Sequence, residues 1–194
     1  TSMKSKSLTA TLTSVALAIC ILNGAASAHG DRSDPAVVLE WNQLLQETLG
    51  PTPPFLSIRA FAMLHVAMFD AVNSIENSYT RYHARVGAPR GASPDAAVAQ
   101  AAHDVLVALF PASAATYDEA LAERLATMDG WRARQGVRVG KAIARRILAW
   151  RENDGWEVAP PAYLPPPLPR LWQPTPPALA AAAFTQVADV KPFA

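Results

Sequence analysis

Pro54-Phe-Leu-Ser-Ile-Arg-Ala-Phe-Ala-Met-Leu-His-Val-Ala-Met-Phe-Asp-Ala-Val-Asn-Ser-Ile75 reads as one long apolar helix. Its apolar side chains point in nearly every direction around the helix axis, which predicts a helix that is buried on all sides. Arg59 and Asp70 lie inside it, and a charged residue near a bilayer centre costs roughly 2.5–3.5 kcal/mol, so a membrane span is not expected. The stretch therefore predicts the central core helix of a bundle, one that a larger protein would enclose more completely.

Two charged residues, a histidine and an asparagine interrupt this apolar helix. At 100° per residue, Arg59, Asp70 and Asn73 fall on one narrow stripe, whereas His65 lies away from it. Buried charges must be paired, so we predict a buried polar network of these four residues in which Arg59 and Asp70 are linked through neighbouring helices. The network either stabilises the bundle or supports an active site, and His65 fits a satisfied core histidine better than a catalyst.

The residues on both sides of this helix also read as helical. No useful period-2 alternation and no hairpin signal is present, so the fold class is all-α, a bundle of about five helices over residues 34–155. Caps and stops predict helices between Asp34 and Gly50, Pro54 and Ile75, Ser93 and Phe110, Ser113 and Asp129, and Trp131 and Asn153, with a loop from Asn77 to Ala92.

The last of these helices has two distinct faces. A seam that runs from small to large residues predicts close contact with a partner helix, at Gly136, Gly140, Ile143, Ile147 and Trp150. The opposite face is basic, with Arg134, Arg138, Lys141 and Arg145, and is expected to be a solvated surface rather than an anion site.

A proline-rich strap, residues 156–194, follows the helices. Half of the residues from Pro160 to Pro177 are proline, which excludes a helix or a central strand. The segment Pro165-Pro-Pro-Leu-Pro169 could be a polyproline II ligand for the aromatic groove of a partner. The strap's own aromatic and leucine side chains instead favour packing onto its own protein, at Trp156, Tyr163, Leu164, Leu171 and Trp172.

Residues 1–28 have the pattern of a secretory signal peptide. Lys4 and Lys6 form a basic start, an apolar run follows, and Ala26-Ser-Ala28 is a cleavage signal. Cleavage would lower the number of basic residues from 17 to 15 against 16 acidic ones and would remove Cys20, the only cysteine. We therefore expect a secreted or periplasmic protein with no disulfide, no membrane attachment after cleavage and no affinity for nucleic acid.

Motifs that carry catalytic chemistry are absent from the sequence. The histidines, at positions 29, 65, 83 and 103, show no zinc-binding spacing, and neither a nucleophile elbow nor a glycine-rich phosphate loop occurs. Glu119 and Glu123 are neighbours on one helix face, where like charges repel, so both are expected to be exposed. No residue of this chain is assigned to catalysis, to a cofactor or to a metal.

Four segments in order resemble the N-terminal half of bacterial vanadium-dependent haloperoxidase-like proteins, of the type 2 phosphatidic acid phosphatase superfamily. They are Val38-Leu-Glu-Trp-Asn42, Leu64-His-Val-Ala-Met-Phe-Asp-Ala-Val-Asn73, Trp172-Gln-Pro-Thr-Pro-Pro177 and Val190-Lys-Pro-Phe193. The resemblance covers essentially all of residues 34–194. Arg170 stands where many relatives have glycine.

The resemblance implies an all-α enzyme that holds vanadate, or phosphate in its phosphatase relatives, and oxidises halide with peroxide or hydrolyses phosphate esters. The family holds the oxyanion with Lys-x6-Arg-Pro, Pro-Ser-Gly-His and Ser-Arg-x5-His-x3-Asp segments, and none of them occurs here. The expectation is a catalytically silent N-terminal portion whose partner is a missing C-terminal half with the vanadate, peroxide, halide or phosphate ester sites. The alternative is a complete, non-enzymatic helical protein whose proline-rich segment binds a partner.

Overall fold

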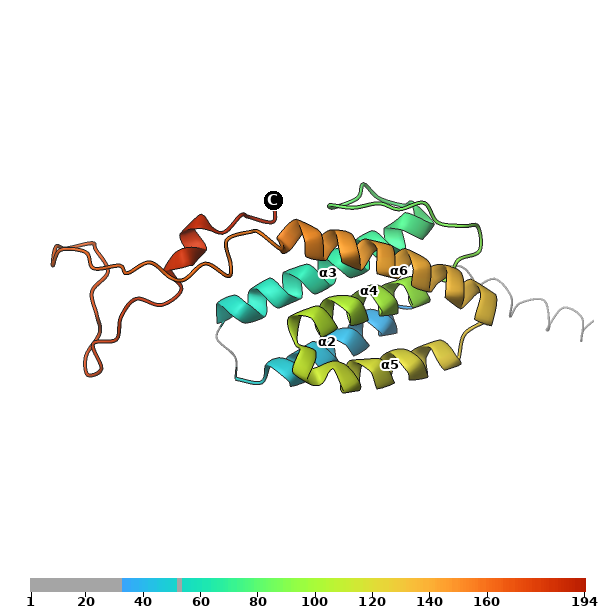
Figure 1. Ribbon diagram of the computed structural model, residues 1–194, viewed down its shortest axis with the longest axis horizontal. Coiled ribbons are helices and arrows are strands. Elements are labelled where there is room, and N and C mark those ends of the chain that lie inside the picture. The colour runs from blue at the N-terminus through green and yellow to red at the C-terminus, as the bar shows by residue number, and fades with distance from the viewer. Residues whose placement is uncertain (1–32, 52–53) are drawn as a thin grey trace, which may run out of the picture. The chain divides into compact units, whose positions relative to one another are not determined.

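The protein is all-α. The computed structural model describes residues 33–51 and 54–194, and within them it has α2 (Pro35–Leu49), α3 (Pro54–Glu76), α4 (Pro94–Leu109), α5 (Ala114–Ala126) and α6 (Gly130–Arg151), with short 3-10 turns η1 (Pro111–Ser113) and η2 (Thr185–Asp189). These ranges confirm the predicted bundle of five helices (Figure 1). The signal peptide expected at residues 1–28 lies outside the described residues.

The helix boundaries follow from local capping. The carboxylate of Asp34 accepts from Ala36 N at 2.9 Å, and Ser93 Oγ accepts from Ala96 N at 3.2 Å, each directly before a proline that begins the helix. Asp129 caps α6 by accepting from the amides of Trp131 and Arg132. Ser113 differs from expectation, because it ends η1 and its side chain makes no capping bond to α5.

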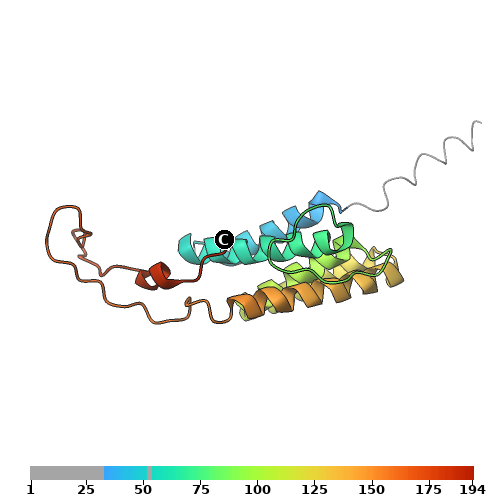
Figure 2. The ribbon, with the colours of Figure 1, turned by 90° about the horizontal axis from the view of Figure 1, so that it is seen from above.

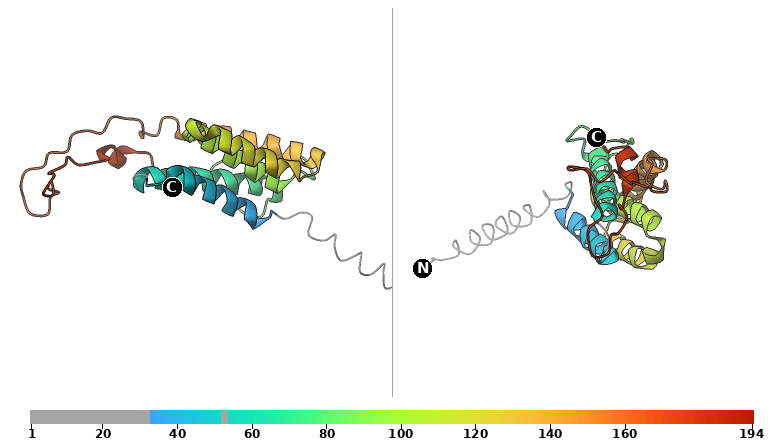
Figure 3. Two further views of the ribbon diagram at one scale, coloured as in Figure 1. Left: turned by 90° about the horizontal axis from the view of Figure 1, so that it is seen from below. Right: turned by 90° about the vertical axis from the view of Figure 1, so that its left-hand side faces the viewer.

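The central helix of the bundle is α4, not α3 as the sequence had predicted. Helix α4 packs against α2, α3, α5 and α6, whereas α3 packs against α2, α4 and α6. Its alanine-rich sequence explains the position, because small side chains allow several neighbours to approach at once. The end-on view in Figure 3 shows the helices side by side as one bundle.

Helices α4 and α6 meet along the predicted glycine seam. Gly136, Gly140, Ile143 and Ile147 are all buried there. A Cβ atom placed on Gly140 would lie 2.5 Å from the carbonyl oxygen of Ala97, so only glycine allows this approach of the two backbones. The basic side chains predicted on the opposite face of α6 are exposed, as are Glu119 and Glu123 on α5.

One face of α3 remains open. Ile58 is 63% exposed, Phe55 46% and Phe69 36%, and His65 is exposed between them. Helix α3 is also long and apolar enough to cross a membrane by length and composition, a property that a core helix shares. The prediction that α3 is buried on all sides is therefore wrong for this face.

The strap leaves the end of α6 and returns to it. The amide of Lys191 donates to the carbonyl of Asp154 at 2.7 Å, so residues 155–190 form a closed loop (Figure 2). At its root Trp156 and Phe55 both contact the ring of Phe184. Farther out the side chains are exposed, Leu164 by 85%, and packing onto the protein's own helices is therefore confined to the root.

Candidate functional site

Asp70 is a fully buried carboxylate that holds a loop rather than a helix. Its Oδ1 accepts from Tyr82 N at 2.7 Å, and its Oδ2 accepts from His83 N at 2.9 Å and from Ala84 N at 2.6 Å. Hydrogen bonds to a charged acceptor are stronger than those between neutral groups. Three consecutive backbone amides are thus fixed against the C-terminal half of α3.

Asn73 and Ser74 extend this attachment along the loop. Asn73 donates to the carbonyl of Tyr79 at 2.6 Å and accepts from its amide at 2.8 Å, and Ser74 Oγ accepts from Val86 N at 3.2 Å. Polar side chains of α3 therefore hold the first half of the loop between α3 and α4, from Tyr79 to Val86. Because these side chains are buried, the loop backbone has a defined position over the helices.

Arg59 has a different partner, and the predicted link between Arg59 and Asp70 is wrong. Its guanidinium lies 3.0 Å from Asp154 at the end of α6, and its ring contact is with Trp156. Arg59 and Asp70 share a stripe of α3, but eleven residues of helix separate them by about 16 Å along the axis. Residues on one stripe point to the same side of the helix but can lie far apart along its axis. Arg59 and Asp70 therefore contact different parts of the protein.

His65 is the other departure from the predicted network. It is exposed on the open face of α3, with its ring stacked near that of Phe61. Partial desolvation lowers its pKa below the ordinary value. His65 lies six residues from Arg59 and five from Asp70, on another side of the helix. The buried polar residues Asp70 and Asn73 are therefore the part of the predicted network that the structure retains.

Arg151 joins the end of the strap to the bundle. Its side chain is buried, donates to Asp154 Oδ2 at 2.8 Å and to the carbonyl of Lys191 at 2.6 Å, and lies 4.0 Å from the ring centre of Phe193. Burial alone would raise the pKa of Asp154, but the amide of Trp156 and the cations Arg59 and Arg151 outweigh it and lower the pKa. This cluster positions residues 191–193, and Asp154 is shared by the two guanidinium groups of Arg59 and Arg151.

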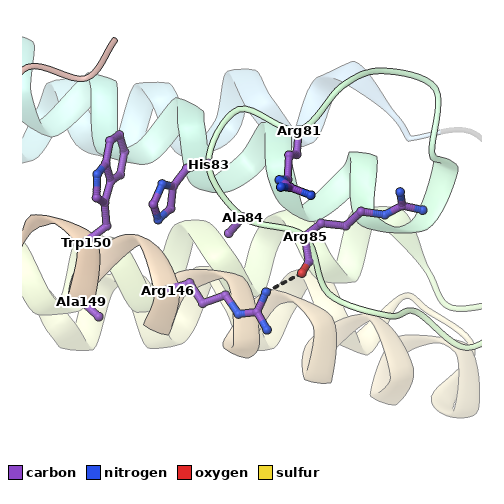
Figure 4. Close-up of a pocket in the computed structure, with 7 residues that line it drawn as sticks. All are labelled: Arg81, His83, Ala84, Arg85, Arg146, Ala149 and Trp150. Carbon is purple, nitrogen blue, oxygen red and sulfur yellow. Dashed lines mark hydrogen bonds between the residues drawn. The ribbon is translucent and has the colours of Figure 1, made fainter.

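A hollow opens where the Asp70-bound loop passes over α6 (Figure 4). Its volume is about 600 Å³, and its lining is Arg81, His83, Ala84, Arg85, Arg146, Ala149 and Trp150. Figure 4 shows the Arg146 side chain reaching from α6 to the carbonyl oxygen of Arg85, to which it donates. The loop and α6 are therefore joined through two residues that line the hollow.

The His83 imidazole is packed flat against Trp150, with ring centres 4.1 Å apart and planes 11° from parallel. Burial is the main cause that lowers its pKa. The nearby carboxylate of Asp70 raises it in part, and Lys191, Arg151 and Arg81 lower it further. The lowered pKa favours a neutral ring beside the arginines, so His83 serves as an aromatic wall.

Two neighbouring hollows share Arg81 and Arg85 with the first. One is lined by Asn77, Ser78, Tyr79 and Thr80, and the other by Ser74, Ile75, Asn77, Val86, Gly87 and Ala88, each together with the two arginines. The sequence carries one signal for this group of arginines. Basic residues at positions 81, 83 and 85 alternate, and in an extended segment alternate side chains point to the same side.

His103 forms a second polar cluster, between α4 and α5. Its Nδ1 lies 2.8 Å from Asp104 Oδ1 and its Nε2 lies 2.7 Å from Asp118 Oδ1. The hydrogen bond to Asp104 is the largest cause that raises the pKa of His103. Burial opposes this effect, and Asp118 adds to it. No sequence spacing predicted the pair with Asp118, because it depends on how two helices pack.

The oxyanion-binding set implied by the resemblance is not reproduced in the hollows. Their lining contains arginines and a histidine but neither a lysine nor the first turn of a helix. His83, the only histidine among them, has one ring face against Trp150. The residues present therefore do not fit the vanadate site of that family. Within residues 33–51 and 54–194 no group of three or more His, Cys, Asp or Glu side chains could hold a metal ion.

Comparisons with known proteins add no assignment. No protein-family model, no curated protein and no solved structure matches the chain.

Proposed function

We propose that this chain is the N-terminal helical portion of an exported haloperoxidase-like or acid-phosphatase-like enzyme, and that it is catalytically silent by itself. In the intact enzyme the bundle serves as a scaffold. The residues that hold vanadate or phosphate belong to a C-terminal half that these 194 residues do not include. The resemblance in four ordered segments motivates the proposal, together with the absence of the three oxyanion-binding segments from the sequence.

The open face of α3 is the observation that supports this proposal most. Ile58 and Phe69 expose large apolar side chains on a helix whose other sides are buried, and Phe55 adds a third at its N-terminal end. Exposed apolar surface of this kind marks contact sites in soluble proteins. A second helical half packed there would give α3 the complete burial that its composition predicts.

The reading frame of the gene tests the proposal directly. We expect an in-frame continuation after Ala194 that encodes Lys-x6-Arg-Pro, Pro-Ser-Gly-His and Ser-Arg-x5-His-x3-Asp in that order. A stop codon immediately after Ala194, or a continuation without these segments, would remove the basis of the proposal.

A second function is favoured by the exposure of the strap. Leu164 and Leu168 are 85% and 56% exposed, and they flank the triple proline of a segment with polyproline II composition. The segment could therefore bind the aromatic groove of a partner. Fluorescence titration of Trp172 with SH3 and WW domains tests this function, and an unchanged signal across both classes of domain would exclude it.

A further inference from the structure

The loop between α3 and α4 presents positive charge at its surface. Arg81 and Arg85 line all three hollows, and Arg146 lines the first of them. No aspartate or glutamate lines any of the three. In the part of the chain that the structure describes, the side chains of Arg81 and Arg85 form neither an ion pair nor a hydrogen bond. Their guanidinium donors are therefore available to a ligand.

The positions of these arginines are set in advance by buried groups. Asp70 fixes the amides of Tyr82, His83 and Ala84, which lie between the two arginines in the sequence. The carbonyl of Arg85 is further held by Arg146. A site whose backbone is already ordered loses less conformational entropy on binding.

The remaining donors indicate the kind of anion. Ser78 and Thr80 supply hydroxyl groups to the hollow beside Arg81 and Arg85. Guanidinium groups bind phosphate oxygens with paired hydrogen bonds, and hydroxyls add neutral donors to such sites. The first hollow, with its aromatic wall of His83 and Trp150, has a volume of about 600 Å³, which exceeds a bare phosphate and suits a phosphate ester.

We propose that Arg81, Arg85 and Arg146, on the Asp70-bound loop and the adjoining turn of α6, form a binding site for the phosphate group of a phosphate monoester. The site is separate from the missing oxyanion pocket and does not depend on the proposed enzyme function. The phosphate could belong to a soluble ester or to the headgroup of a lipid, since the recognising chemistry is the same.

Calorimetric titration of the 194-residue chain tests the site in two arms at constant ionic strength. One arm uses glycerol phosphate, and the other uses phosphatidylcholine vesicles with and without phosphatidic acid. We expect saturable binding in at least one arm, and the arm in which it occurs identifies the source of the phosphate. In a ¹⁵N spectrum, the ligand should shift the amides of residues 78–85.

The variant R81Q/R85Q should bind the phosphate ligand at least about tenfold more weakly than the wild type. Each lost hydrogen bond from a charged donor contributes strongly to binding. The matched control is R134Q/R145Q, which removes the same charge from exposed positions on α6 that line none of the hollows. All four side chains are exposed, so circular dichroism should show unchanged folding.

Three results would overturn the proposal. The first is no binding in either arm. The second is an equal loss of affinity in R134Q/R145Q, which would indicate general charge attraction. The third is equally tight binding of a glutamate-rich peptide, which would show a site for carboxylates rather than phosphate.

Discussion

Asp70 shows how one buried residue can define a surface. Its carboxylate accepts hydrogen bonds from three backbone amides of the loop that carries Arg81, His83 and Arg85. The side chain itself reaches no solvent. Its effect on any ligand is therefore exerted through the position of the loop.

Asp70→Asn tests this role. The side-chain amide of asparagine is neutral, and its NH2 group would face loop N–H groups that are themselves hydrogen-bond donors. We therefore expect a loss of about 1.5–3 kcal/mol in the free energy of unfolding. Hydrogen exchange at Tyr82, His83 and Ala84 should accelerate. Urea unfolding and exchange mass spectrometry measure the two effects, and Glu123→Gln, an exposed change of the same chemistry, is the control. Unchanged exchange at the three amides would contradict the role of Asp70.

His103 gives a pH dependence whose sign follows from its partners. Its pKa is raised above 6.5 by Asp104 and Asp118, so the protonated ring stabilises the fold. This stabilisation is complete below the unfolded-state pKa of about 6.5 and is lost as the pH rises through the folded-state value.

Comparison of the wild type with His103→Gln isolates this contribution from those of the other histidines. We expect His103→Gln to lower the free energy of unfolding more at about pH 5.5 than at about pH 9. Urea unfolding of both proteins at several pH values measures this difference. A difference that stays constant with pH, or grows as the pH rises, would show that the imidazolium does not hold α4 to α5.

At the scale of elements, the contact of α4 with α6 depends on glycine. A methyl group on Gly140 would meet Ala97 O at 2.5 Å and Gln100 Cβ at 2.8 Å, both on α4. Alanine is the better helix former by about 1 kcal/mol, so helix propensity and packing act in opposite directions here.

Gly140→Ala should be destabilising, because overpacking a close backbone contact costs roughly 1–3 kcal/mol and exceeds the gain in helix propensity. Thermal unfolding provides the measurement. Gly87→Ala is the matched control, since a Cβ there would meet nothing within 4 Å. Greater stability of Gly140→Ala would mean that α4 and α6 lie farther apart than described.

The end of the strap is held to the bundle by Arg151. Its guanidinium donates to the carbonyls of Lys191 and Pro192 and packs on Phe193, while Asp154 keeps a second cation in Arg59. Arg151→Met should therefore release residues 191–193 and leave the helices assembled. Limited proteolysis should cut the strap faster than in the exposed control Arg145→Met, and equal cleavage rates would show that other contacts hold the strap.

At the scale of the molecule, the sequence predicted where the helices begin and end better than it predicted which helices and side chains contact one another. Helix boundaries depend on caps such as Asp34 and Ser93, which act within one turn and can be read locally. The choice of α4 over α3 as the central helix could not be read in this way, because apolar composition does not specify which faces are covered. The partners of Arg59 and His103 lie 95 and 15 residues away in the sequence and depend on packing.

The candidate site was predictable only in part for the same reason. The buried polar residues Asp70 and Asn73 were identified from their stripe on α3, but their partners are loop amides that no side-chain pattern reveals. The arginines that they position lie in a segment without regular structure. Only the alternation of positions 81, 83 and 85 pointed to them.

We propose that these helices are the non-catalytic half of an oxyanion-dependent enzyme. The most direct measurement is an assay of peroxide-dependent bromination and phosphate ester hydrolysis, with and without vanadate, on this chain and on the complete product of its reading frame. We expect activity in the complete product and none in the 194-residue chain. Vanadate-dependent bromination by the 194-residue chain alone would contradict the proposal.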